Sequence, residues 1–312
     1  MKLPPLNVLL FDEKYARSNC YISQILETLE NDFRVNRIYI HKRNSFKKLI
    51  SSPYPVLSLL QARILLQKRL EILSLIESSK ILIYDQDPWE SFIDTGSIKG
   101  SYEEFIKVLN VDSFLVTSKW WAKNIRAFGF PVEYVQMGVL KRLHSKNVDF
   151  GSRKVPIFFQ GTLHDYRKDF FGKLTLDNVD VDIRHSEKYS KFLKNLRKAK
   201  IFLHISPQNW KINNQLVYSN CCWIKDLEAV SQGCISIRNR DDEYYLQEID
   251  RIPAIETFVN PVEIKDILHR IDAISLKEIK GIIEESKFFV SENMNWKQIV
   301  NIVRDHAEPK YF

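Results

Sequence analysis

The sequence is poor in glycine and cysteine and has no long apolar run. Its 9 glycines nowhere spell GxGxxG or GxxxxGK[ST], which excludes a dinucleotide fingerprint and a Walker P-loop at the level of motifs. The 4 cysteines include no CxxC spacing, so the sequence indicates no zinc site and no disulfide framework. No stretch approaches the ~20 apolar residues of a membrane-spanning helix, and the N-terminal apolar run is too short for a signal peptide. We therefore expect a soluble, cytoplasmic protein that at most touches a membrane surface.

Composition and charge further limit the class of protein to which this chain can belong. Hydrophobic residues make up 45% and charged residues 27%, which is typical of globular domains and excludes a disordered chain. At 312 residues the chain exceeds what one hydrophobic core serves efficiently, so two domains are expected. The net charge is +7, and residues 1–150 hold 21 basic and 16 acidic side chains. This surplus favours anionic partners such as phosphates, an acidic membrane surface or nucleic acid, although a solubilising surface also accounts for it.

In the first half, short apolar runs alternate with amphipathic stretches, which is the pattern of a parallel sheet with crossover helices. The expected strands cover residues 7–11, 35–40, 80–84, 113–117 and 132–136, and the expected helices 19–29, 57–77, 102–109 and 119–128. The pattern restarts after a polar, basic linker. The second set of strands covers 155–160, 179–184, 201–206, 234–238 and 252–258, with helices over 167–174, 187–199, 214–231, 242–250, 261–273, 276–292 and 296–306.

This pattern predicts an α/β protein with two Rossmann-like domains facing each other across a cleft, plus a C-terminal helix. The expected ranges are an acceptor domain over 1–145, a donor domain over 146–290 and a terminal helix over 291–312. In open parallel sheets ligands bind beyond the carboxyl ends of the strands, so the cleft is the expected site.

Two acids follow the strand expected over residues 80–84, within the segment KILIYDQDPWE. Asp85 or Asp87 could act as a general base on an acceptor hydroxyl, and Trp89 could supply an aromatic floor for an acceptor ring. The alternative is that one aspartate caps a turn and the tryptophan belongs to the core.

Small and basic residues follow the strand VPIFFQ in the segment GTLHDYRK. Gly161 and Thr162 would let the backbone approach a ligand closely, and His164, Arg167 and Lys168 lead into a helix whose N-terminus favours an anion. We expect these five residues to bind the diphosphate of a nucleotide. An ordinary turn followed by a solvated first helical turn is the alternative.

Five further residues are candidates because they follow expected strands or begin an expected helix. Asp12 and Ser118 are expected to line the acceptor site, and His185, Ser206 and Asn214 the donor site. A helix cap or turn is the alternative for Asp12, and a satisfied structural histidine for His185.

The segment LEAVSQGCISI, within residues 214–238, resembles the retaining, group 1-like GT-B glycosyltransferases, in which a helix ends LEAxAxGxPVI before a strand. The resemblance places Glu228 on the glutamate that holds the nucleotide ribose hydroxyls. Twin Rossmann-like domains and a terminal helix, here NWKQIVNIV, that crosses back to the first domain also match that family. Asn220 stands where the family usually has a first glutamate, eight positions earlier.

The resemblance implies transfer of a sugar from a nucleotide-diphosphate sugar to a hydroxyl of a glycan or lipid-linked saccharide, with no metal or other cofactor. It implies that Arg167 and Lys168 neutralise the diphosphate and that anomeric configuration is retained. A base role for Asp85 or Asp87 belongs to an inverting enzyme, so both retention and inversion of the anomeric configuration remain open.

Three alternative functions also remain: a DNA-modifying glucosyltransferase, a non-catalytic nucleotide-sugar binding protein and a sugar-nucleotide epimerase.

Overall fold

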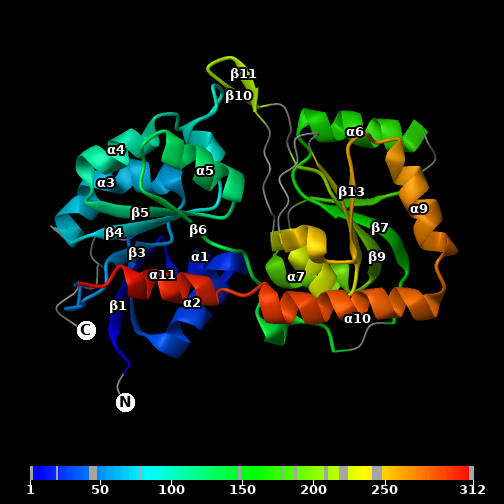
Figure 1. The fold of residues 1–312 in the computed structure, drawn as a ribbon, viewed down its shortest axis with the longest axis horizontal. Helices are drawn as coiled ribbons and strands as arrows, with labels where there is room; N and C mark the ends of the chain where they lie inside the picture. Colours follow the sequence, from blue (N-terminus) through cyan, green and yellow to red (C-terminus); the bar gives the residue numbers. More distant parts are fainter. Residues whose placement is uncertain are drawn as a thin grey trace. The chain divides into compact units, whose positions relative to one another are not determined.

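The computed structural model describes residues 3–18, 20–41, 48–77, 79–146, 149–176, 179–185, 188–206, 210–217, 224–240 and 248–308. These residues form two compact units (Figure 1). The first unit draws on residues 1–136, 210–217 and 296–312, and the second on 137–209 and 218–295.

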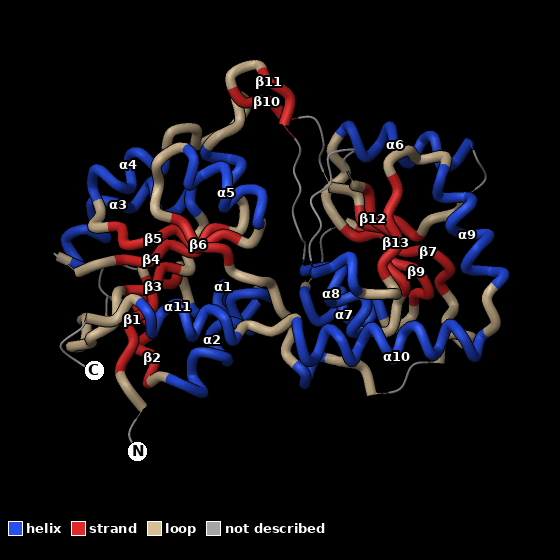
Figure 2. The backbone as a smooth tube through the Cα atoms, in the orientation of Figure 1, coloured by secondary structure: helices blue, strands red, loops and turns tan. Residues whose placement is uncertain are grey.

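The first unit is built on a six-stranded parallel sheet whose strands run in the order β2-β1-β3-β4-β5-β6. The strands are β1 (Pro5–Leu10), β2 (Arg34–Tyr39), β3 (Val56–Ser58), β4 (Ile81–Asp85), β5 (Val111–Val116) and β6 (Val132–Tyr134). The helices are α1 (Glu13–Ser18), α2 (Cys20–Asp32), α3 (Ala62–Ile76), η2 (Pro88–Ser91), α4 (Ser101–Val108), α5 (Lys119–Ala127) and α11 (Lys297–Asp305). Figure 2 shows α3, α4 and α5 on one face of the sheet and α1, α2 and α11 on the other.

The second unit contains a five-stranded parallel sheet in the order β13-β12-β9-β7-β8. Its strands are β7 (Val155–Gln160), β8 (Asp182–Arg184), β9 (Ala199–His204), β12 (Ile235–Asn239) and β13 (Ile255–Phe258). Its helices are η3 (Lys141–Leu143), α6 (Asp165–Leu176), α7 (Tyr189–Leu196), α8 (Ile224–Ser231), η4 (Glu248–Arg251), α9 (Glu263–Ala273) and α10 (Leu276–Asn293). Two parallel α/β sheets confirm the predicted fold class of paired Rossmann-like domains.

Both faces of the second sheet are covered, because successive side chains along a strand point to opposite faces. Phe158 and Phe202 pack with α7 and α8, whereas Phe159 and Leu203 pack with α6, α9 and α10. The apolar runs that identify these strands in the sequence are the residues of this two-sided core.

Two expectations about elements are wrong, and a third is largely untested. The apolar run predicted as the start of a helix at residue 57 is strand β3, and the helix begins at Ala62; a short buried strand and a buried helix segment look alike in sequence. The helix expected from Asn214 is misplaced at its start, because Gln215–Val217 form a strand, and the described part of the helix covers Ile224–Ser231. The helix expected over 242–250 falls largely outside the described residues.

A hairpin over residues 210–217 overlaps the start of the helix expected over 214–231, and it belongs to the first unit. Its strands are β10 (Trp210–Ile212) and β11 (Gln215–Val217), joined by a two-residue turn. Asn213 and Asn214 have φ values of 50° and 62°, a left-handed conformation that asparagine tolerates and that suits a two-residue hairpin turn. The Asp94 carboxylate accepts the backbone N–H groups of both asparagines, at 3.0 and 2.8 Å.

The C-terminal helix α11 is fixed to the first unit by an imidazole held between two carboxylates. His306 Nδ1 lies 2.6 Å from Asp112 Oδ2, and its Nε2 contacts Glu133 Oε1. Both ring nitrogens can donate only when the ring is charged. Burial opposes the charged imidazolium, but the hydrogen bonds to Glu133 and Asp112 outweigh it and raise the pKa of His306.

This geometry predicts how stability depends on pH. Because the folded pKa of His306 is raised, its contribution is complete below about pH 6.5 and is lost as the pH rises through the folded value. The pair is partly exposed, so we expect at most about 1 kcal/mol, or a few °C in the melting temperature. Thermal unfolding from pH 6 to 9 of the wild-type chain and of His306→Gln measures it. An unchanged pH dependence in His306→Gln would show that another group is responsible.

Candidate functional site

In each sheet the polar candidates lie at the carboxyl edge near a topological switch point, where successive connections leave in opposite directions. In the first unit the switch falls between β1 and β3, and in the second between β7 and β9.

A pocket of about 170 Å³ lies at the carboxyl edge of the first sheet, between the residues after β3 and those after β4. It is lined by Tyr21, Leu60, Gln61, Ala62, Arg63, Tyr84, Asp85, Gln86, Asp87, Glu90 and Ile98. Its volume is below the ~300 to 1,000 Å³ typical of whole-ligand sites, so it fits part of a ligand. The structure therefore brings both predicted acids to one pocket, together with a third acid, Glu90, that the sequence analysis missed.

Asp85 is the last residue of β4 and is buried. Its Oδ2 accepts the Tyr102 hydroxyl at 3.1 Å, and its Oδ1 accepts the Asp87 backbone N–H at 3.1 Å. Tyr102 is itself fixed by stacking on Phe114 at 3.9 Å between ring centroids. Asp85 is thus rigidly held and orients the turn that carries Asp87.

Burial makes both acids weak, and among the described residues no cation is hydrogen-bonded to either of them. Desolvation raises the pKa of Asp85 to about 6, opposed by the hydrogen bonds from Asp87 and Tyr102. Desolvation, with repulsion from Asp85 and Glu90, raises the pKa of Asp87 to about 8. Such values, close to neutrality, suit groups that exchange protons.

A cation missed by the sequence analysis also lines this pocket. Arg63, at the start of α3, donates from Nη2 to Ser97 Oγ at 2.7 Å and lies 3.7 Å from Glu90 Oε2. It was hidden because its helix was predicted to begin several residues earlier, so Arg63 did not stand out as a residue at a strand end.

The three predicted acceptor residues lie elsewhere at this carboxyl edge. Asp12 follows β1, and its carbonyl accepts the Ala16 N–H. Trp89 is half-buried in η2. Ser118 is buried and caps α5, because its Oγ accepts the Trp121 N–H at 3.2 Å. None of the three lines the pocket that holds Asp85 and Asp87.

In the second unit, Arg167 of α6 fastens together the two loops at the switch point. Its Nε and Nη2 donate to the Ile205 carbonyl at 3.0 and 2.7 Å, and its Nη1 donates to the Thr162 carbonyl at 2.7 Å. A Cβ on Gly161 would lie 3.4 Å from Arg167 Nη1 and 3.2 Å from the Phe159 ring. A glycine therefore lets the guanidinium lie close against the strand end.

The other predicted residues of this loop point to solvent. Lys168 pairs with Asp165 at 2.9 Å, and both are exposed. His164 stacks on Tyr166, and His185 follows β8 on the surface. Of the expected basic pair, the structure places only Arg167 at the switch point.

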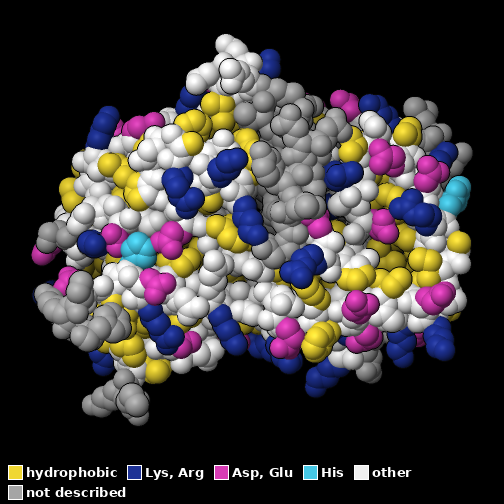
Figure 3. Space-filling view, in the orientation of Figure 1, with side chains coloured by type: hydrophobic (Ala, Val, Ile, Leu, Met, Phe, Trp, Pro, Cys, Tyr) yellow, Lys and Arg dark blue, Asp and Glu magenta, His cyan; other side chains and the backbone are white. Residues whose placement is uncertain are grey.

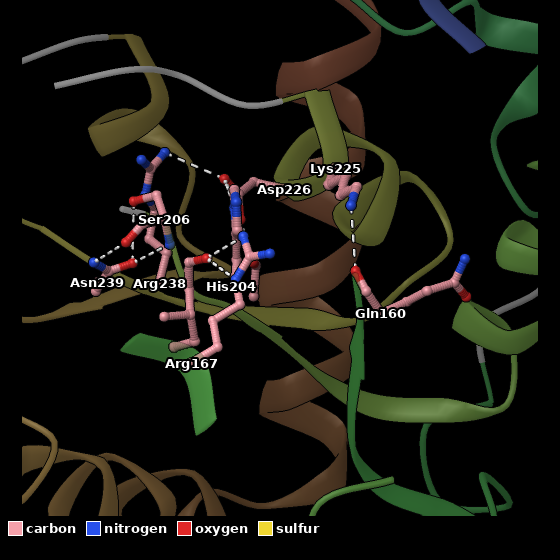
Figure 4. A network of polar contacts seen from close by, with 10 residues as sticks. Gln160, Arg167, His204, Ser206, Lys225, Asp226, Arg238 and Asn239 are labelled. Carbon is pink, nitrogen blue, oxygen red and sulfur yellow. Dashed lines mark hydrogen bonds and ion pairs between the residues drawn. The ribbon is translucent and has the colours of Figure 1, made fainter. Parts of the chain in front are cut away.

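A buried charge network lies behind the loops after β9 and β12 (Figure 4). The fully buried Asp226 carboxylate contacts His204 Nδ1 at 2.8 Å, Arg238 Nη1 at 3.2 Å and Ser236 Oγ at 2.8 Å. Burial opposes the charge, but His204, Arg238 and Ser236 together lower the pKa of Asp226. Burial outweighs the attraction of Asp226 and lowers the pKa of His204.

Ser206 and Glu228 are both buried at this edge of the second sheet. Asn239 Oδ1 accepts the Ser206 backbone N–H at 2.7 Å and lies 3.1 Å from its hydroxyl. Figure 4 also shows Lys225, in the first turn of α8, reaching the Gln160 carbonyl at 3.2 Å. Lys225 was not among the predicted site residues, because a lysine on a helix is expected to be solvated.

Asn214, predicted among the donor residues, lies in the hairpin turn of the first unit rather than on a helix of the second. Asn220, at the position of the family's first glutamate, lies outside the described residues.

Comparison with known proteins shows which solved structures share this fold. No family profile matches the sequence, and no curated protein is significantly similar to it. The structure is similar to HepE of Anabaena in complex with UDP and glucose, with TM-score 0.63, 9% identity and coverage of 97% of this chain and 100% of the other. Sucrose-phosphate synthase from Thermosynechococcus elongatus gives TM-score 0.62 and 11% identity, covering 97% and 98%. The chain has the GT-B fold. An α-glucosyltransferase in complex with UDP and a 13-mer DNA is also similar, with TM-score 0.51 and 11% identity, covering 97% and 100%.

The geometry at Arg167 gives a test within this GT-B chain. Arg167→Lys should destabilise the second unit by about 2 kcal/mol, because lysine cannot span both loops and leaves the Ile205 and Thr162 carbonyls without its charged donor. Denaturant unfolding measures the loss. The neighbouring exposed cation is the matched control, and Lys168→Gln should change stability by less than about 0.5 kcal/mol. Equal effects of the two substitutions would contradict the role assigned to the guanidinium.

Proposed function

We propose that the chain is a glycosyltransferase that moves a sugar from a nucleotide-diphosphate sugar to a hydroxyl on a glycan or lipid-linked saccharide, without a metal. The observation that carries the proposal is the pair of weakly acidic aspartates in a pocket at the carboxyl edge of one sheet. The similar structures of HepE with UDP and glucose and of sucrose-phosphate synthase support it at the level of fold.

The donor belongs to the second unit in this proposal. Arg167 and Lys225 are two cations at the switch point, each hydrogen-bonded to a backbone carbonyl there. Together with the positive end of α8 they would stabilise the negative charge that develops on the departing diphosphate. Glu228, buried in α8, would accept the ribose hydroxyls as the sequence resemblance implies. These groups supply the charge neutralisation for which a metal would otherwise be needed.

The acceptor belongs to the pocket of the first unit. Asp87 would take the proton of the acceptor hydroxyl while that oxygen attacks the anomeric carbon and the bond to the diphosphate breaks. Asp85, held by Tyr102, would position Asp87 and raise its proton affinity. A base-assisted direct displacement inverts the anomeric carbon, so the configuration of the product reports on this role.

The donor assignment predicts a selective response to nucleotides. One nucleoside diphosphate among UDP, GDP, CDP, TDP and ADP should raise the melting temperature, because a ligand that binds only the folded state stabilises it. Glu228→Gln, which keeps the size of the side chain, should weaken that nucleotide about tenfold or more by removing a charged acceptor. Exposed Glu285→Gln, on α10, is the control. If no diphosphate shifts the melting temperature at millimolar concentration, the proposal fails.

The acceptor assignment predicts a pH profile. Because the pKa of Asp87 is about 8, its basic form appears as the pH rises, and kcat/KM should increase between pH 6 and 8. Asp87→Asn should lower kcat by about 10²- to 10⁴-fold without weakening the nucleotide. Glu90→Gln should move the profile to lower pH, since it removes a repelling charge.

The exposed Glu103→Gln is the control for that series and should leave kcat unchanged. Full turnover in Asp87→Asn would remove the aspartate pair from the mechanism.

A DNA acceptor is the second candidate, and the structural similarity to an α-glucosyltransferase bound to DNA favours it. Duplex binding whose affinity falls steeply with salt, together with incorporation of labelled sugar into DNA, would support this candidate over a glycan acceptor.

A further inference from the structure

The second unit carries a dense group of cations along α7, which runs from the carboxyl end of β8 back to the amino-terminal end of β9. Residues 188–200 hold no acidic side chain, and five cations there are exposed: Lys188, Lys191, Lys194, Arg197 and Lys198. Lysines three or four positions apart share one face of a helix. The opposite face of α7 is buried through Phe192, Leu193 and Leu196. We call the exposed side the basic face.

A basic pocket of about 450 Å³ adjoins the end of this face. Its lining combines four cations, Arg153, Lys154, Arg197 and Lys198, with two serines and one acid, Asp149. Within the part of the chain that the structure describes, Lys154 and Lys198 take part in no ion pair. With four cations and one acid in its lining, the pocket carries a net positive charge.

Arg153 forms the fixed floor of the basic pocket. It is buried, and its guanidinium donates to the carbonyls of Leu196, Ala199 and Gln232 at 3.2, 2.5 and 2.6 Å. It ties the start of β9 to the end of α8, so the cations around it are displayed on a rigid support.

An apolar pocket of about 310 Å³ lies beside the starts of β7 and β9, close to the basic pocket. Its lining is almost wholly apolar and includes Phe150, Ile157, Ile201 and Leu276, with Lys200 and Asp272 as its only charged members. The Leu276 side chain is 61% exposed and lies against Gly151 in the segment that joins the two pockets. Charge and apolar surface are thus contiguous.

We propose that this edge of the second unit docks onto a membrane surface rich in acidic phospholipid. The basic face and basic pocket would meet the phosphate groups, and Leu276 with the apolar pocket would take up acyl chain. Nucleic acid matches the charge but has no apolar part to fill the second pocket. Figure 3 shows further Lys and Arg side chains along the lower edge of the second unit. On α10, Lys277 and Lys280 are exposed. The docking leaves the carboxyl edge free for the donor.

Sedimentation of the full chain with vesicles tests the proposal. Phosphatidylcholine vesicles containing about a third phosphatidylglycerol should bind the chain, and pure phosphatidylcholine vesicles should not. Lys191→Gln, Lys194→Gln and Lys198→Gln combined should weaken binding at least tenfold, because each cation near an anionic surface contributes about fivefold. Leu276→Ser should weaken it further and independently of salt, because it acts through apolar contact.

The matched control removes three exposed lysines elsewhere, Lys48, Lys107 and Lys173, and should bind as the wild type does although its net charge is the same as that of the triple variant. Equal losses in both triple variants would mean that overall charge alone acts, and would overturn the proposal. The proposal would also be overturned if a DNA duplex bound the chain as tightly as the vesicles do and Leu276→Ser did not change that affinity. Unchanged nucleotide-induced thermal shifts in all variants show that folding and the donor site are intact.

Discussion

Burial of two parallel sheets on both faces is the constraint on which this molecule depends. Side chains along β4, β7, β9 and β12 are enclosed by helices and are mostly apolar, so polar chemistry is left to the strand ends. Asp85 is the last residue of β4, and His204 is the last residue of β9. The buried groups Asp85 and His204 therefore lie at the carboxyl ends of their strands.

The pKa of a buried carboxylate shifts in opposite directions in the two units. Asp226 is surrounded by Arg238, His204 and Ser236, so it keeps its charge and organises the loops around it. Asp85 has a tyrosine hydroxyl and a backbone N–H but no cation in contact, so its pKa rises. A compensated charge serves structure, whereas an uncompensated pair near neutrality suits proton transfer.

The second sheet has polar functions at both ends of its strands. Arg167 and Lys225 lie where β7 ends, and Lys154 and Lys198 lie where β7 and β9 begin. Strands of six residues, roughly 20 Å long, separate the two sets. The proposed donor site and the proposed membrane-docking surface therefore use different side chains of one domain.

By itself the sequence determined the fold class, most strand positions and the location of Asp85 and Gly161 at strand ends, because apolar periodicity and turn residues are local signals. It failed where the signal was ambiguous or long-range. The run around β3 fits a strand or a helix equally. Asn214 was predicted to start a helix, because its partner in the hairpin turn, Asp94, is over a hundred residues away in the sequence.

Only the tertiary structure decided which candidates meet. It brought Glu90 and Arg63 to the pocket of Asp87, turned Arg167 onto the Ile205 carbonyl, left Lys168 in solvent and gathered Lys154 with Lys198. The physical reason is that a side chain's partners depend on how the strands are ordered in the sheet, which local periodicity does not encode.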